Sequence, residues 1–118
     1  MAGKFSVALH DVNEITITVT GRVTGREISA PVWFVAESGK LYLLPVHGSD
    51  SDWYKNVLKT PQLQLTADQA TITATDTPIT DPAGVRTVVD KFRAKYGADQ
   101  ITAYYPKTDV GVEVTLPE

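Results

Sequence analysis

Alternating hydrophobic and polar positions at the start of the chain predict β-strands. Residues 5–9 alternate in this way, and residues 15–19 repeat the period after a polar turn at 11–13. A period of two places every second side chain on one face of a strand. The two segments are therefore predicted to form a β-hairpin.

Two longer hydrophobic runs follow, at 28–35 and 41–46. The polar turn between them predicts a second hairpin, more deeply buried than the first. Pro31 and Pro45 interrupt these runs. Because proline cannot donate a ladder hydrogen bond, each marks a bulge, an edge or a strand end.

The period then changes to that of a helix in two places. Hydrophobic residues recur at helical spacing over 51–58 and again over 82–96. For the second helix, Asp81 is a typical N-cap, Pro82 fits the first turn and Gly97 ends the segment. The sequence thus predicts two helices.

Three further strands are predicted, and they complete a mainly β architecture. Closing the strands into a barrel removes exposed edges, so we expect a small β-barrel of six to seven antiparallel strands with two helices, in one domain over residues 1–118. Side chains fill the interior of so small a barrel, which places any ligand outside it or at a subunit seam. A homodimer is therefore expected. The further strands span 63–67, 70–76 and 110–116.

Composition excludes several classes of protein. The 118 residues contain no cysteine, which excludes disulfides and thiolate metal sites, and the net charge of −3 disfavours nucleic-acid binding. No hydrophobic run has the length of about 20 residues that a membrane helix needs. The first residues do not resemble a signal peptide, so a cytoplasmic location is expected. His10 and His47 have no metal-ligand spacing and predict no metal site.

The loop 21–26 is the first candidate site. Its two glycines free the backbone, while Arg22 and Arg26 offer planar guanidinium groups suited to a phosphate or carboxylate. The loop leads into a strand that carries Trp33, which has a surface suited to stacking. A flat aromatic ligand with an anionic tail fits this arrangement; an ordinary solvated loop is the alternative.

The segment 46–54 is the second candidate, because it ends where a helix is expected to begin. Free backbone N–H groups at such a start favour an anion or a polar ligand atom, but Asp50 and Asp52 argue against a bare phosphate. His47 is a possible ligand contact. The alternative is helix capping with a tryptophan in the core. Tyr104 and Tyr105 are expected to pack in the barrel, with a pocket wall as their alternative role.

The order of these features resembles the flavin/deazaflavin oxidoreductase family of split β-barrels. The motifs are a TGR-x-x-GR loop, the strands PVWFV and GKLYLL, the helix DWYKNVLKTP and the strand QLQL, from about Ile15 to Thr66. Relatives in that family include pyridoxamine 5′-phosphate oxidase and the small deazaflavin-dependent nitroreductase-like proteins. The segment before the first helix is shorter and more acidic than the glycine- and proline-rich segment of the deazaflavin-dependent nitroreductases. No proton donor of those reductases can be assigned to a residue of this chain.

The resemblance implies a cofactor site. The basic loop and the strand after it would hold the cofactor's phosphate-bearing tail, the next four residues would face its ring, and the loop before the helix would approach it. A lysine of that helix would add to the positive charge that holds the tail. The implied residues are Arg22, Thr24, Arg26 and Ser29 for the tail and Ala30, Pro31, Val32 and Trp33 for the ring. The loop and helix residues that would approach the cofactor are His47, Gly48, Ser49, Ser51 and Lys55.

The implied function is that of an oxidoreductase. It would bind a deazaflavin coenzyme or FMN and transfer a hydride to a small electrophile of the quinone or nitro-aromatic type, with the cofactor supplying the hydride chemistry. A non-catalytic barrel that carries a small molecule or cofactor is the first alternative. A barrel that only docks a partner is the second.

Overall fold

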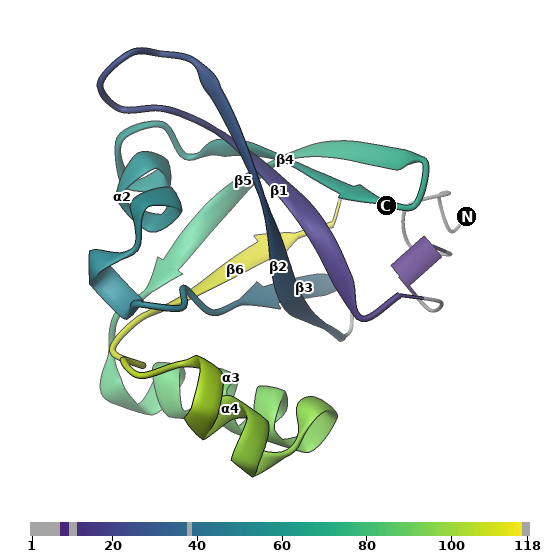
Figure 1. Cartoon of the computed structure of the whole chain (residues 1–118), viewed down its shortest axis with the longest axis vertical. Coiled ribbons are helices and arrows are strands. Elements are labelled where there is room, and N and C mark those ends of the chain that lie inside the picture. The colour runs from purple at the N-terminus through teal and green to yellow at the C-terminus, as the bar shows by residue number, and fades with distance from the viewer. Residues whose placement is uncertain (1–7, 10–11, 38, 117–118) are drawn as a thin grey trace.

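The computed structural model describes residues 8–9, 12–37 and 39–116 (Figure 1). Over residues 12–37 and 39–116, six strands and three α-helices alternate with short loops, and a single 3₁₀ turn, η1, precedes the first of these helices. The strands are β1 (Glu14–Thr20), β2 (Glu27–Glu37), β3 (Lys40–Leu43), β4 (Gln62–Ala67), β5 (Ala70–Ile79) and β6 (Gly111–Thr115). The helical segments are η1 (Gly48–Asp50), α2 (Asp52–Lys59), α3 (Pro82–Tyr96) and α4 (Ala98–Tyr104).

The strands close into an antiparallel barrel in the order β1-β2-β3-β6-β5-β4. β1 completes the ring because it pairs with β2 along one edge and with β4 along the other. The prediction of a mainly β barrel is confirmed. The first strand of the hairpin, predicted for residues 5–9, is wrong at Ala8 and Leu9, which are helical. Residues 5–7 lie outside the described residues. β1 has other partners than the predicted one: it pairs with β2 over residues 14–20 and with β4 over residues 16–18.

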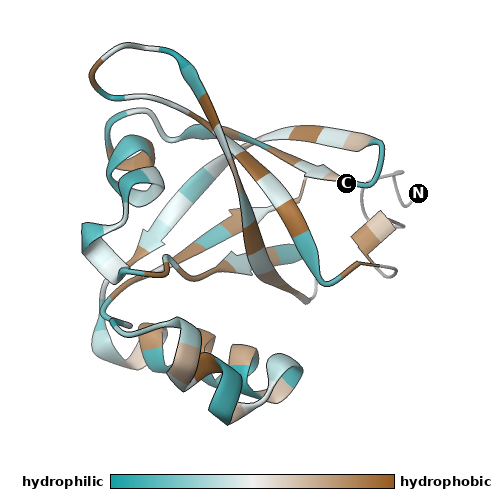
Figure 2. Cartoon of the chain, viewed as in Figure 1, coloured by the Kyte–Doolittle hydropathy of each residue, from teal (hydrophilic) through white to brown (hydrophobic). Residues whose placement is uncertain are grey.

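Alternation along the strands builds the core. Ile15, Ile17 and Val19 are all buried in the barrel, as their period predicts, and the hydropathy colours of Figure 2 alternate along the strands. A second core lies outside the barrel wall, where α3 and α4 cover it. Its centre is Phe92, which is fully buried. Burial of a side chain of this size contributes roughly 2–3 kcal/mol.

The sequence predicts α3 well and misses α4. The Asp81 carboxylate caps α3 by accepting a 2.8 Å hydrogen bond from the Gly84 N–H, and Gly97 ends the helix with a φ of 97°. The chain then turns directly into α4, which buries Ile101 against the second core. Two helices were predicted, at 51–58 and 82–96, and both are present. α4 is too short to show a clear hydrophobic period.

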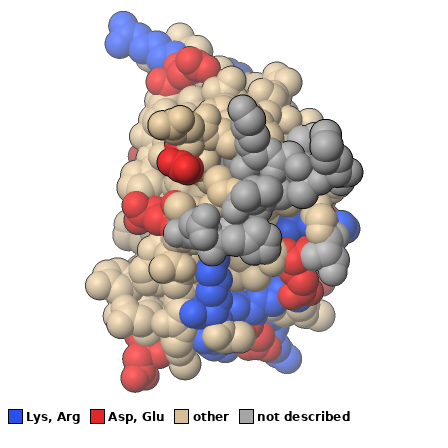
Figure 3. All heavy atoms as spheres, turned by 90° about the vertical axis from the view of Figure 1, so that its right-hand side faces the viewer, with Lys and Arg blue, Asp and Glu red and all other residues tan. Residues whose placement is uncertain are grey.

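The exposed side of α3 carries basic residues that have acidic or carbonyl partners. Lys91 lies 2.6 Å from Glu37 and Arg93 lies 3.1 Å from Asp90, while Lys95 donates to the Phe34 carbonyl. On the face shown in Figure 3, basic and acidic side chains lie next to one another. Within the described segments, no helix is both long enough and apolar enough to cross a membrane.

Candidate functional site

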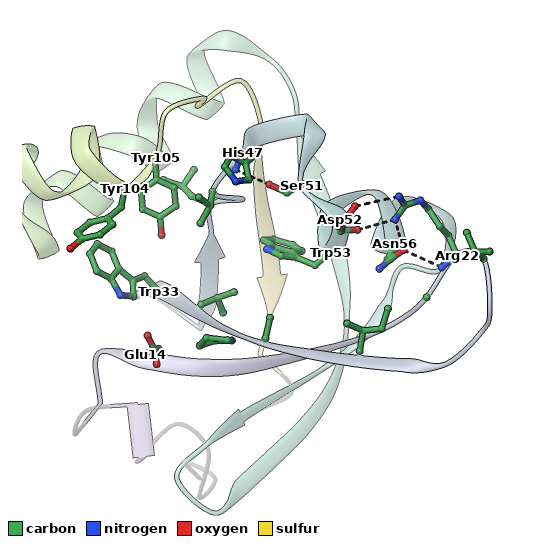
Figure 4. Close-up of a pocket in the computed structure, with 18 of the residues that line it drawn as sticks. Glu14, Arg22, Trp33, His47, Ser51, Asp52, Trp53, Asn56, Tyr104 and Tyr105 are labelled. Atoms are coloured by element: carbon green, nitrogen blue, oxygen red, sulfur yellow. Dashed lines mark hydrogen bonds and ion pairs between the residues drawn. The ribbon is translucent and has the colours of Figure 1, made fainter.

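A cavity of about 910 Å³ lies beside the barrel, between the loop after β1, the strand β2, the start of α2 and the end of α4 (Figure 4). The register of the described strands explains its position. β2 pairs with β1 from Glu27 to Trp33 and with β3 only from Phe34 onward. The first part of β2 therefore has one edge without a neighbouring strand, and the cavity lies along this edge. Pro31 is located here, at an edge, which is one of the three positions that the sequence allowed for it.

Aromatic side chains wall the cavity at one end. Trp33 stacks on Tyr96, with ring centroids 4.4 Å apart and an interplanar angle of 12°, and meets Tyr104 and Tyr105 edge to face. Burial raises the pKa of the Tyr105 hydroxyl far above its usual range. Tyr104 is 57% exposed and lines the cavity, so its role is that of a pocket wall. Trp53 of α2 lines the cavity between the two ends (Figure 4).

Tyr96 holds Trp33 in place from behind. Its hydroxyl oxygen accepts a hydrogen bond from the Phe34 N–H at 3.1 Å and lies 2.8 Å from the carbonyl oxygens of both Asn13 and Phe34. Burial raises the pKa of this hydroxyl. The tyrosine thus joins α3 to β2, and the indole that stacks on it is fixed on one face.

Arg22 lies at the other end of the cavity, and its guanidinium is bound to α2. Nη1 donates to Asn56 Oδ1 at 2.8 Å and to the Asp52 carbonyl at 3.3 Å, and Nη2 lies 3.4 Å from the Asp52 carboxylate. The Arg22 backbone N–H also donates to Asn56 Oδ1, at 3.0 Å. Lys59 reinforces the contact by donating to the Arg22 carbonyl at 2.8 Å. These bonds fix the loop between β1 and β2 on α2.

Asn56 is buried, and replacing it with alanine is expected to lower the free energy of unfolding by about 1–2 kcal/mol. The substitution removes an oxygen that accepts two hydrogen bonds from the loop. Urea unfolding monitored by tryptophan fluorescence measures the loss. Arg22→Ala is the matched comparison, because it keeps the backbone bond to Asn56 and should cost less. A larger loss for Arg22→Ala would contradict this account.

The segment from His47 to Ser51 divides between the cavity and a neighbouring loop. His47 and Ser51 line the cavity, and the Ser51 hydroxyl oxygen accepts a 2.8 Å hydrogen bond from the His47 N–H. Ser49 lies away from the cavity: its N–H and its hydroxyl donate to the Asp109 carboxylate at 2.9 and 2.6 Å. Burial acts to raise the pKa of Asp109, but the two bonds from Ser49, the Asp109 backbone N–H and the charge of Lys107 together lower it.

Gly48 is held in the left-handed region, with a φ of 56°. A Cβ at this position would collide with the Asp109 carboxylate and with Lys107. We expect Gly48→Ala to destabilise the protein by about 2 kcal/mol, through backbone strain and collision together. Gly39→Ala is the control, since Gly39 has a φ of 77° with open space around it, and strain alone should cost about 1 kcal/mol. Equal losses in thermal unfolding would rule out the collision.

The cavity brings together many of the residues that the sequence and its family resemblance suggested. Others lie elsewhere: the Ser29 hydroxyl is 2.8 Å from that of Thr18, and Gly48 and Ser49 face Asp109. The suggested residues that line the cavity are Arg22, Thr24, Ala30, Pro31, Val32, Trp33, His47 and Ser51. Those that do not line it are Arg26, Ser29, Gly48, Ser49 and Lys55.

Sequence reasoning missed several lining residues, among them Glu14 and Asn56, and it predicted Tyr104 to pack in the barrel with a pocket wall as its alternative role. A signal existed for Asn56, which lies one helical turn after Asp52 on the same side of α2. Trp53 was weighed mainly as a core residue. Glu14 gave no signal, because it reaches the site only through its pairing with Trp33 across β1 and β2.

Fold and cavity together define a small split barrel with an aromatic pocket beside it. The chain belongs to the family described as "Uncharacterized protein conserved in bacteria (DUF2255)", which it matches over residues 7–114. A comparison with curated proteins finds no match.

Solved structures with the same fold carry diverse descriptions, and at these identities the likeness establishes the fold. An F420-H2 dependent reductase is 18% identical, with a TM-score of 0.67 over 86% of this chain and 93% of its own. A protein from Bacteroides thetaiotaomicron, described as a candidate 5-nitroimidazole antibiotic resistance protein, is 15% identical. Its TM-score is 0.76, over 100% of this chain and 82% of its own. HutZ, a heme storage protein from Vibrio cholerae, is 13% identical, with a TM-score of 0.74 over 96% of this chain and 87% of its own.

Proposed function

We propose that this protein binds the ring of a flavin-class cofactor, of the kind that a deazaflavin coenzyme or FMN carries, and transfers a hydride from it to a small electrophile of the quinone or nitro-aromatic type. The observation that carries the proposal is the cavity along the open edge of β2, walled by Trp33, Trp53 and Tyr104. Its volume of about 910 Å³ lies within the range of about 300–1,000 Å³ found for small-molecule and cofactor sites.

The ring of such a cofactor fits this cavity. Ala30, Pro31, Val32 and Trp33 lie along the part of β2 that has β1 on one side only, so its backbone offers polar groups on the other side. A flat heteroaromatic ring needs apolar faces and polar partners along its edge, and the aromatic walls and the strand edge supply both. These four residues would hold the ring.

When bound, the cofactor supplies the hydride, and the protein supplies position and surroundings. Trp33 is fixed by Tyr96 and gives the ring a rigid wall. Trp53 and Tyr104 keep water from the space beside it. His47 brings an imidazole to the same cavity, where it can hydrogen-bond a polar edge of the ring or of the acceptor.

We further propose a homodimer in which the second copy covers the mouth of the cavity. Val23, Ile28, Val46 and Tyr104 all line the cavity and are between 43% and 88% exposed. Exposed hydrophobic residues grouped around one opening are typical of an interface. Sedimentation velocity with the ligand-free protein tests this, and a monomer at all concentrations would contradict it.

A non-catalytic carrier is the second candidate, and a specific observation favours it. Among the described residues that line the cavity, the hydrogen bonds of Arg22, Asp52, Asn56 and Ser51 fix the loop and the helix. None of these bonds joins a proton donor to a base facing the open space. The cavity is therefore better built for holding a ring than for proton transfer.

Titration of the purified apoprotein tests the proposal. Riboflavin, FMN, the deazaflavin coenzyme and hemin are added separately, and binding is followed by ligand absorption and by quenching of tryptophan fluorescence. Saturable binding of a flavin or deazaflavin, followed by reoxidation of the reduced complex with a quinone or a nitro-aromatic, supports the oxidoreductase. Saturable binding without reoxidation supports the carrier. Binding of none of the flavins or deazaflavins by folded protein overturns the proposed function.

A further inference from the structure

Charged groups at both ends of the cavity bear on the ligand's tail. In Figure 4, Asp52, Asn56 and Arg22 form one end, and Glu14 lies at the other beside Trp33. The cavity lining that the structure describes includes two carboxylates and one guanidinium, and the net charge of these three groups is one negative. A site for a polyanion would carry the opposite sign.

The one guanidinium is already occupied. Its hydrogen bonds go to Asn56 Oδ1 at 2.8 Å and to the Asp52 carbonyl at 3.3 Å, and the Asp52 carboxylate lies 3.4 Å from Nη2. A phosphate placed on Arg22 would have to displace these partners and would lie beside the carboxylate of Asp52. Asp52 also occupies the first turn of α2, where the helix dipole would otherwise favour an anion.

The other basic side chains around the site do not make up for this. Arg26 and Lys55 do not line the cavity. Lys59 donates to the Arg22 carbonyl at 2.8 Å, and Lys107 lies 2.8 Å from Asp50. In the described segments, therefore, no second cation from these residues stands beside Arg22 in the wall of the cavity.

We propose that the cavity selects a flavin-class ring with an uncharged tail and discriminates against a phosphate-bearing, polyanionic tail, and that Asp52 sets this preference by neutralising Arg22. This inference rests on the proposed function. The ring provides the affinity through the aromatic walls, while the tail meets a site of the wrong charge. The Asp52 side chain is 88% exposed, so its removal should leave the fold intact.

The test compares riboflavin, FMN and the deazaflavin coenzyme by fluorescence titration of the wild type and two variants. The wild type should bind riboflavin at least as tightly as FMN, and the deazaflavin coenzyme more weakly than either. Asp52→Asn should shift the ratio of FMN affinity to riboflavin affinity toward FMN by about 1.5- to fivefold, the range for an exposed ion pair. Asp99→Asn is the matched control, because it removes an exposed carboxylate that does not line the cavity and should leave this ratio nearly unchanged.

Salt provides a second readout. If Arg22 is neutralised, FMN affinity should not fall as ionic strength rises from about 20 mM to about 500 mM, since screening weakens only a net attraction. FMN or the deazaflavin coenzyme binding the wild type tenfold or more tightly than riboflavin, with a ratio unchanged in Asp52→Asn, would overturn the inference alone. Failure of all three ligands to bind would overturn the proposed function, and the inference with it.

Discussion

Replacing Asp76 with asparagine is expected to raise the free energy of unfolding at neutral pH by about 2 kcal/mol. Asp76 lies on the inward face of β5, opposite Val114 of β6, and is 5% exposed. Among the residues that the structure describes, neither oxygen of its carboxylate has a hydrogen-bond partner. Burial therefore raises the pKa of Asp76 to about 6. At neutral pH the folded protein holds a charged, unpaired carboxylate inside the barrel, and asparagine removes that charge with little change of shape.

The dependence on pH identifies the cause. The pKa of Asp76 is higher in the folded protein, about 6, than in the unfolded chain, about 3.9, so the folded state retains the proton longer. The penalty is absent below about pH 4, grows as the pH rises to about 6 and stays constant above that. The difference in stability between Asp76→Asn and the wild type should follow this curve in urea unfolding at several pH values. Asp99→Asn, at an exposed position, should change stability by less than about 0.5 kcal/mol. A difference independent of pH would show that the charge is not responsible.

This carboxylate also bears on the site. Tyr54 of α2 is buried, and its hydroxyl pKa is raised by burial, by Asp109 and by the charge of Asp76. α2 carries Asp52, Trp53 and Asn56, which line the cavity. The negative charge of Asp76 thus disfavours ionisation of Tyr54, a residue of the same helix that carries these lining residues.

Replacing Trp33 with alanine should weaken the binding of riboflavin about 10- to 100-fold, the effect of removing one stacking surface from a flat ring. The substitution also removes the stack on Tyr96 and the contacts with Tyr104 and Tyr105. We expect a loss of about 2–3 kcal/mol in the free energy of unfolding, below that of a fully buried tryptophan because Trp33 is only half-buried.

Trp33→Phe separates these two effects. Phenylalanine retains an aromatic face toward Tyr96, so stability should largely recover, and riboflavin affinity should recover in part. Titrations are made at a temperature at which all variants are folded, as judged by circular dichroism. Trp33→Ala protein that is folded and binds riboflavin like the wild type would show that the ring lies elsewhere, and the proposed cavity would be wrong.

The sequence predicted most elements because their signals are local. The alternation at Ile15, Ile17 and Val19 identified β1, and Asp81, Pro82 and Gly97 identified the ends of α3. It failed at α4, whose seven residues span two turns and show no stable period. It also failed at Ala8 and Leu9, which are helical, because alternation over only five residues is too short to distinguish a strand from a helix.

For the site, the sequence by itself determined which residue types were present: two arginines in a glycine-bearing loop, Trp33 in the strand that follows, and acidic residues before a helix. Only the tertiary structure decided how they act. Closure of the barrel left one edge of β2 open and brought Trp53, Asn56 and Tyr104 to it. Arg22 pairs with Asp52 and Asn56, 30 and 34 residues away, while Asp76 points inward and has no hydrogen-bond partner in the described part of the chain. Periodicity and capping depend on neighbours in sequence, whereas the charge state and partners of a side chain depend on groups that folding alone brings within reach.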